Sequence, residues 1–275
     1  MRLTDPAALH RLEPQLASRS RHTRTLSHVE RATFSDLVAP PRGGRVFDLS
    51  MRPGLADCAP SGRIRLDALA RWLQDVAYAD VEDAGLAGGS LWVLRRSRIR
   101  AERFPRFAER FDVRTFCSGL GRMWAERRTT ITREGAPAVE AVALWVHLDP
   151  QQRRPAPLSP EEIATYGGAG AAVVRRVTAR LRHPAPDGAR EARRWRFRAT
   201  ECDMADHVNN AAYWEPIEEE LLENGADPDW VDAEIEFRTP SQPGEKLVLA
   251  AGERRWIVSP ERETHASIAL RAGTR

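Results

Sequence analysis

The chain has 275 residues, 42% of them hydrophobic, which is enough for one large domain or for two domains of ordinary size. Its mean hydropathy is -0.49, and no apolar run reaches the roughly 20 residues that a membrane-spanning helix needs. The net charge of +3 is compatible with an acidic partner, but no nucleic-acid-binding motif accompanies it. We therefore expect neither a membrane span nor a complex with nucleic acid.

Cysteine and histidine usage argues against bound metal. Cys58, Cys117 and Cys202 are widely spaced and odd in number, which is typical neither of a disulfide framework nor of a CxxC metal site. The histidines show no metal-ligand spacing with acids or cysteines. We expect a reducing, cytoplasmic location, no metal and no cofactor.

Residues 1–42 differ in composition from the rest of the chain. They are rich in Arg, Ser and Pro, and they lack the apolar core of a secretory signal. They also contain acidic residues, which an organelle transit peptide would lack. We predict a flexible N-terminal extension that ends at the Pro- and Gly-rich stretch 40–44.

A first run of elements comes after the extension. An alternating segment at 46–51 predicts a strand, and apolar residues at helical spacing from Leu66 predict one amphipathic helix that ends before Gly85. Strand-like segments, with glycine-containing turns between them, lie at 92–99, 109–118, 123–133 and 138–148. We predict a first domain at 43–160.

The same order of elements then restarts. Residues 161–190 form a predicted linker with one short helix or strand near 171–181. A strand at 194–200 and a polar loop at 201–209 lead into a helix with a bend near Pro216. Further strands are predicted at 233–239, 246–253, 255–259 and 265–271. We predict a second domain at 191–275.

This repeated order predicts an α+β fold. An antiparallel sheet curled around a long central helix, formed twice and packed together, buries one apolar helix face per sheet. Local sequence supports the repeat, because Asp57-Cys58-Ala59 precedes the first helix much as Asp203-Met204-Ala205 precedes the second. This alignment sets Ser61 at the place of His207.

The loop before the second helix carries the candidate chemistry. It contains Glu201, Asp203, Asp206 and His207, followed by Asn209 and Asn210. A helix start can stabilise an oxyanion that forms when water attacks a carbonyl carbon, and Asp203 or His207 can activate that water while the other orients it. From the residues alone, an ordinary helix cap with a structural histidine is the simpler explanation.

The string from Asp203 to Tyr213 resembles the D-x-x-x-H-V-N-N-x-x-Y signature of the acyl-carrier-protein (acyl-ACP) thioesterases of plants and bacteria. The first half adds three similarities: a tryptophan-containing strand at 91–96, the Phe104-Pro105 turn, and the strand at 144–149 with its double-arginine linker. That family consists of double hot-dog proteins, so the resemblance implies two tandem hot-dog folds.

The resemblance also implies a function. We expect hydrolysis of fatty acyl-ACP to free fatty acid and carrier thiol in fatty acid biosynthesis. Asp203 and His207 would be catalytic, with Asn209 and Asn210 at the oxyanion-stabilising helix start. The first copy would have lost catalysis and would build the acyl pocket, with Trp92 and Trp145 as candidate lining.

Two positions depart from the family pattern. Ala205 stands where members commonly carry Asn, and Pro240-Ser241 stands where a Glu-Cys pair is often found. Glu201, Asp206 and Ser241 are therefore auxiliary candidates, and nothing in the sequence selects one of them. Cys202 is a weak candidate nucleophile, since cysteine chemistry requires a lowered thiol pKa.

Several alternatives stay open. The partner is acyl carrier protein with its acyl-phosphopantetheine arm, or acyl-CoA in the alternative acyl-CoA thioesterase. A non-catalytic acyl-binding hot-dog protein is the other alternative, for which Ala205 and Pro240 speak. Arginine-rich strands at 95–100 and 193–198 fit either an acidic carrier or a solvated sheet face equally. Acyl chain length, branching and the choice between monomer and homodimer are not determined.

Overall fold

The computed structural model describes residues 44–87, 91–167, 184–185 and 187–274. The predicted extension at 1–42 and the short element expected near 171–181 lie outside these residues. Within the described part of the chain, no helix combines the length and the apolar character needed to cross a membrane.

The first half surrounds one long helix, α3 (Leu66–Asp83). Its fully buried residues Leu66, Leu69 and Val76 recur at helical spacing, so one face of the helix packs on the sheet. The strands are β1 (Val46–Met51), β2 (Leu91–Ala101), β3 (Phe111–Leu120), β4 (Trp124–Arg133) and β5 (Ala136–Leu148). Short helices η2 (Leu55–Asp57) and α4 (Pro160–Gly167) flank this half.

The second half repeats this order around a shorter helix. Its strands are β6 (Arg190–Phe197), β7 (Trp230–Phe237), β8 (Gly244–Ala251), β9 (Arg254–Val258) and β10 (Thr264–Gly273). After η3 (Ala199–Glu201), the central helix forms in two parts, η4 (Asn210–Trp214) and α5 (Glu215–Glu223). Pro216 lies in the first turn of α5, where its missing N–H leaves no helical hydrogen bond unmade. The bend predicted near Pro216 is therefore the change from η4 to α5.

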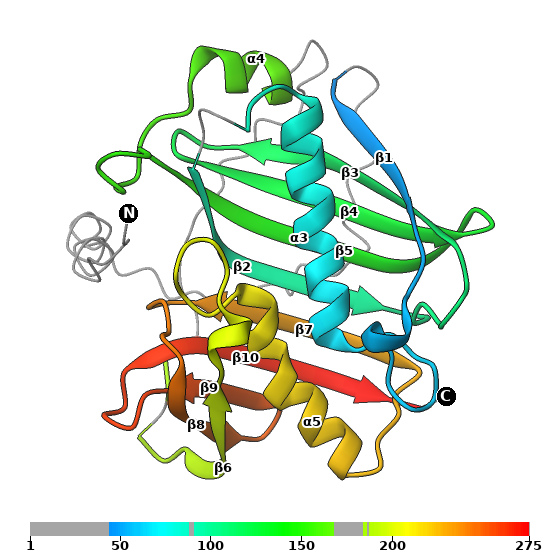
Figure 1. The fold of residues 1–275 in the computed structure, drawn as a ribbon, viewed down its shortest axis with the longest axis vertical. Helices are drawn as coiled ribbons and strands as arrows, with labels where there is room; N and C mark the ends of the chain where they lie inside the picture. Colours follow the sequence, from blue (N-terminus) through cyan, green and yellow to red (C-terminus); the bar gives the residue numbers. More distant parts are fainter. Residues whose placement is uncertain (1–43, 88–90, 168–183, 186, 275) are drawn as a thin grey trace, which may run out of the picture.

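The two halves join into one ten-stranded antiparallel sheet. Its order is β1-β3-β4-β5-β2-β7-β10-β9-β8-β6, so the second half repeats the order of the first in reverse, with β2 against β7 at the junction. Helices α3 and α5 lie on the same face of the curled sheet (Figure 1). This arrangement confirms the predicted hot-dog architecture. The division into domains at 43–160 and 191–275 stays a prediction.

One hydrophobic core serves both halves. Its buried side chains include Trp72 and Ile99 from the first half and Trp214 and Ile235 from the second. Along the junction, Ser97 pairs with Ile235 and Ile99 with Ala233, and all four are buried. The halves are therefore not two separately packed units.

The loops before the two central helices have the same backbone hydrogen bonds. Ala59 N donates to Arg63 O at 2.7 Å, as Asp203 N donates to His207 O at 3.0 Å. The bridge between Cys58 and Ile64 matches the bridge between Cys202 and Val208. Gly62 and Asp206, the residues before Arg63 and His207, both have positive φ, at 84° and 61°.

This correspondence corrects the alignment drawn from the sequence. Asp203 corresponds to Ala59 rather than to Asp57, and His207 corresponds to Arg63 rather than to Ser61. A three-residue similarity misled the alignment by two residues, whereas the backbone hydrogen bonds define the register.

Arg63 forms a buried ion pair between the halves. Its Nη2 lies 2.7 Å from Glu218 Oε1 on α5, and both side chains are almost fully buried. Glu218 Oε2 also accepts a hydrogen bond from Leu66 N at 3.0 Å, at the start of α3. Arg63 further contacts Asp227 at 2.8 Å and lies over the Phe104 ring at 4.9 Å. Arg63 and Glu218 thus satisfy each other's charge and hydrogen-bonding groups at a place that is closed to solvent.

We predict that Glu218→Gln lowers the free energy of unfolding by about 3–5 kcal/mol, because it leaves the buried Arg63 charge without its main partner. Urea denaturation followed by circular dichroism measures this change. Glu245→Gln, which breaks the exposed pair between Arg196 and Glu245, should change stability by less than about 1 kcal/mol. Equal effects of the two substitutions would show that the buried pair does not hold the halves together.

Candidate functional site

The loop between η3 and η4 is closed by its own backbone. Asp206 N donates to Asp203 O at 3.0 Å, and Asn209 N donates to Glu201 O at 2.8 Å. Val208 N donates to Ser241 O at 2.9 Å and thereby ties the loop to the segment after β7. These bonds fix the backbone from Asp203 to Asn209. A fixed backbone lets the side chains of this loop keep a defined geometry relative to one another.

Asp203 and His207 lie beside each other in this loop. Asp203 Oδ1 accepts a hydrogen bond from Ala205 N at 2.9 Å, and Oδ2 accepts one from the Asn209 amide at 3.1 Å. His207 Nδ1 lies 3.8 Å from Asp203 Oδ1 and 3.2 Å from Val208 O. A carbonyl oxygen only accepts, so Nδ1 is the donor in the contact with Val208 O, and a neutral imidazole in this tautomer has its lone pair on Nε2.

The two asparagines have different surroundings. Asn209 is the N-cap of η4, and its Oδ1 accepts from Ala211 N at 2.8 Å. Its amide also makes two hydrogen bonds of 3.3 Å with the Gln74 amide on α3. Asn210, the first residue of η4, lines a large cavity that adjoins the loop. The helix start is thus capped by Asn209 and presents Asn210 to that cavity.

The large cavity has a volume of about 530 Å³. Asp203, His207 and Asn209 form part of its wall, while most of the remaining wall comes from the first half. Most of the first-half lining is apolar or aromatic, and the rest is polar or charged. The apolar and aromatic members include Ala77, Tyr78, Val81, Leu91, Trp92, Val93, Leu94, Ala125 and Trp145, and the polar and charged ones are Gln74, Asp75, Arg95, Glu126, Arg127 and Arg153. Trp92 and Trp145, the candidate pocket residues from the sequence, both line this cavity. The pair of loop residues therefore faces an apolar space that the other half builds.

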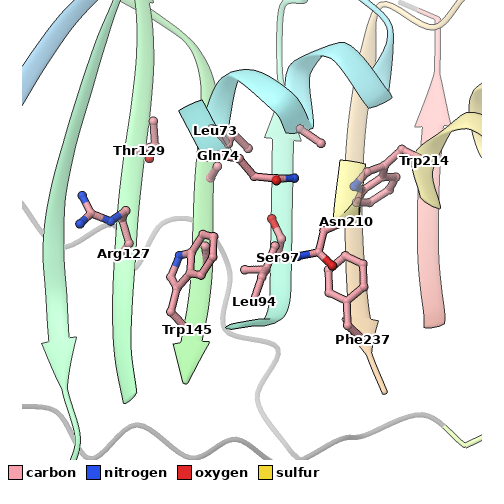
Figure 2. A pocket seen from close by; sticks show the side chains of 13 residues that line it. Leu73, Gln74, Leu94, Ser97, Arg127, Thr129, Trp145, Asn210, Trp214 and Phe237 are labelled. Atoms are coloured by element: carbon pink, nitrogen blue, oxygen red, sulfur yellow. The ribbon is translucent and has the colours of Figure 1, made fainter. Parts of the chain in front are cut away.

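A second, much smaller cavity of about 20 Å³ lies against the same residues. Figure 2 shows Gln74, Asn210, Ser97 and Trp145 around it. Gln74, Trp145 and Asn210 line both cavities. The sequence did not single out Gln74, because a polar residue beside Leu73 is ordinary in an amphipathic helix.

The auxiliary candidates have partners of their own outside the cavity wall. Glu201 is buried and accepts from Arg198 N at 3.0 Å and from Arg198 Nε at 2.5 Å. The main-chain carbonyl of Asp206 accepts a hydrogen bond from Gln242 Nε2 at 2.9 Å. Ser241 is buried, and its hydroxyl donates to Gln242 O at 3.1 Å. None of the three is among the residues that line either cavity.

The departing positions Ala205 and Pro240 both line the large cavity. Their side chains are apolar, so the wall beside Asp203 lacks the amide and the carboxylate that the family pattern would supply there. Burial raises the pKa of the nearby Cys202 thiol, and the charges of Asp206 and Asp203 raise it further. This thiol is protonated at neutral pH, which argues against Cys202 as a nucleophile.

The arginine-rich strands do not form one surface. Strand β2 lies inside the sheet and β6 at its edge, with β7, β10, β9 and β8 between them. Arg98 pairs with Asp232 at 2.9 Å, and Arg196 pairs with Glu245 at 2.9 Å. These ion pairs favour a solvated sheet face. Arg95 is different, because a register shift between Leu94 and Arg96 accompanies its position in the cavity wall.

Across the described residues, no group of three or more His, Cys, Asp or Glu side chains is arranged to hold a metal ion. Burial and acidic residues close to the loop raise the pKa of Glu215. Glu215, in the first turn of α5, has a pKa raised from its ordinary value of 4.5 to about 7. Burial is the main cause, followed by the charges of Glu201 and Asp67.

Comparison with known proteins identifies relatives along most of the chain. Residues 44–166 match the model of the acyl-ACP thioesterase N-terminal domain, and residues 185–268 match that of the acyl-ACP thioesterase C-terminal domain. A protein of Mycobacterium tuberculosis described as uncharacterized is 25% identical over 223 residues, which cover 81% of this chain and 88% of the relative.

Solved structures share the fold. A putative oleoyl thioesterase from Lactobacillus plantarum has a TM-score of 0.70 at 20% identity, covering 84% of this chain and 97% of that one. An acyl-ACP thioesterase from Bacteroides thetaiotaomicron has a TM-score of 0.65 at 17% identity, covering 82% and 97%. The 12:0-ACP thioesterase from Umbellularia californica has a TM-score of 0.63 at 16% identity, covering 82% and 97%.

The raised pKa of Glu215 predicts a pH-dependent stability. Between pH 4.5 and about 7, the folded protein retains a proton that the unfolded chain has released, so the free energy of unfolding falls as pH rises through this window. Glu215→Gln should therefore be more stable than the wild type at about pH 8, by about 1 kcal/mol or more, and nearly equal to it at about pH 5. Urea titrations at both pH values test this. A variant that is less stable at the higher pH would contradict the assignment.

Proposed function

The chain belongs to the acyl-ACP thioesterase family, and we propose that it hydrolyses fatty acyl-ACP at the loop that carries Asp203 and His207. The reaction releases a free fatty acid and the carrier thiol. The observation that carries the assignment of the site is that Asp203 and His207 line the same cavity as the apolar wall of the first half. An acyl chain and its thioester can occupy that space together.

His207 is the proposed general base. Its Nδ1 is directed to Val208 O, so the Nε2 lone pair takes a proton from the attacking water. The water oxygen bonds to the thioester carbon, and a tetrahedral oxyanion forms. Asp203, 3.8 Å from Nδ1, stabilises the imidazolium that results. When the carbon–sulfur bond breaks, the imidazolium returns the proton to the leaving thiolate.

The start of η4 is the proposed oxyanion site. Asn210 lines the cavity, and its side-chain amide can donate to the developing negative charge. The positive end of the helix that begins there acts in the same direction. Asn209 has a different role, because its amide is occupied by Asp203, Ala211 N and Gln74.

The first copy of the loop is proposed to be non-catalytic, because Ala59 and Arg63 stand where Asp203 and His207 stand in the second. The proposed setting of the reaction is fatty acid biosynthesis in the cytoplasm. The family supports the first part of that setting, and the unpaired Cys58, Cys117 and Cys202 fit a reducing compartment.

Asp203→Asn and His207→Ala should each reduce thiol release by about 100-fold or more, since each removes a group that moves or stabilises the transferred proton. Release of free thiol from an acyl-ACP substrate measures the loss, and circular dichroism checks the fold. Asp112→Asn, a matched change at an exposed position on β3, should leave the rate unchanged. Tight acyl binding without turnover in the wild type would instead support the acyl-binding alternative.

The carrier is tested with one acyl chain on two carriers. We expect a higher kcat/KM for acyl-ACP than for acyl-CoA, because a protein carrier contacts the enzyme beyond the phosphopantetheine arm that both share. Free-thiol release at several salt concentrations gives the two values. Equal or greater kcat/KM for acyl-CoA would favour the acyl-CoA thioesterase alternative.

A further inference from the structure

A pair of side-chain amides joins the central helix of the first half to the catalytic loop of the second. Gln74 Nε2 donates to Asn209 Oδ1 at 3.3 Å, and Asn209 Nδ2 donates to Gln74 Oε1 at 3.3 Å. Both residues line the large cavity. From these contacts we infer that Gln74 is a positioning residue for the reaction, acting through Asn209 on Asp203.

Gln74 holds the plane of the Asn209 amide, whose orientation is selected by Ala211 and Asp203. Asn209 Oδ1 accepts from Ala211 N at 2.8 Å, while Nδ2 donates to Asp203 Oδ2 at 3.1 Å. Turning the amide over would bring Oδ1 against the Asp203 carboxylate and Nδ2 against the Ala211 N–H group. The paired hydrogen bonds with Gln74 hold the amide plane in place, and with it one of the two donors that fix the Asp203 side chain.

The repeat contains a counterpart of this contact. In the first half, Arg63 and Leu66 N receive Glu218 from α5. In the second half, the matching loop receives Gln74 from α3. In both cases a side chain from one central helix reaches the loop or helix start of the other half.

The charge of each reaching side chain suits its surroundings. Glu218 faces the Arg63 guanidinium, so a carboxylate is stabilised there. Gln74 faces Asn209, which already donates to Asp203. A carboxylate at position 74 would bring a second negative charge near Asp203, whereas a neutral amide supplies both a donor and an acceptor without one. The catalytic loop therefore depends on a residue from the half that lacks the catalytic pair.

The inference rests on the proposed function, and a double-mutant cycle tests it. Gln74→Met keeps the length of the side chain and removes both hydrogen bonds. We expect kcat to fall about tenfold with KM within about twofold, because the substrate still binds while the catalytic groups are less well positioned. Asn209→Ala should lower kcat at least as much, and adding Gln74→Met to it should cause no further loss.

The control is Glu82→Gln, an exposed position on the same helix outside the cavity wall, which should leave kcat and KM unchanged. Additive losses in the double variant would overturn the inference, since Gln74 would then act independently of Asn209. A rise in KM with kcat unchanged would also overturn it and make Gln74 a substrate contact.

A measurement without substrate separates this inference from the proposed function. The side-chain amide resonances of Asn209 in the NMR spectrum should shift in Gln74→Met and stay in place in Glu82→Gln. Unchanged Asn209 resonances in Gln74→Met would overturn the inference whatever the activity. A wild-type protein that releases no thiol from any acyl thioester would overturn the proposed function, while the resonances still report on the contact.

Discussion

The pairing of β2 with β7 is the contact on which the rest of the molecule depends. It joins two five-stranded halves into one sheet and sets α3 and α5 on the same face. Without it, each half would expose a central strand edge with unpaired backbone groups, and the shared core would open to water. Because the helices are side by side, the loop before each one lies within reach of the other helix. The Arg63–Glu218 ion pair and the Gln74–Asn209 amide pair both result from this geometry.

The two loops show how a duplicated backbone can carry different chemistry. Their main-chain hydrogen bonds are the same, and these depend little on side-chain identity. The side chains have diverged: Arg63 is buried against a carboxylate, whereas His207 faces a cavity. One copy thus forms a buried ion pair at the junction of the halves, and the other leaves its polar groups open to the cavity. A buried ion pair in one half and a proposed catalytic pair in the other are alternative uses of the same loop.

The cavity explains why both halves belong to one site. Its apolar wall comes mainly from α3 and the strands of the first half, while Asp203, His207 and Asn210 belong to the second. Ala205 and Pro240 contribute apolar lining beside Asp203, at positions where the resemblance implies polar side chains. The proposed chemistry therefore depends on how accurately Asp203 and His207 are positioned. The contact from Gln74 to Asn209 contributes to that positioning.

The sequence by itself determined the order of elements, the repeat and the site loop. Alternating and helical periodicities report local burial, which is why the helix from Leu66 and the strands around it were predictable, with boundaries a few residues off at β3, β6, β7 and β8. The resemblance selected Asp203 and His207, and the structure brings both to one cavity.

Tertiary structure alone decided the register of the repeat, the strand order and the partners across the halves. The correspondence of His207 with Arg63 rests on backbone hydrogen bonds, which leave no trace in residue identity. Gln74 and Asn209 are far apart in the chain, and no periodicity encodes such a contact. Local pattern reports which face of an element is buried, but it does not specify which distant element covers that face. That choice is made by packing between the halves, and the geometry of the proposed site was decided there.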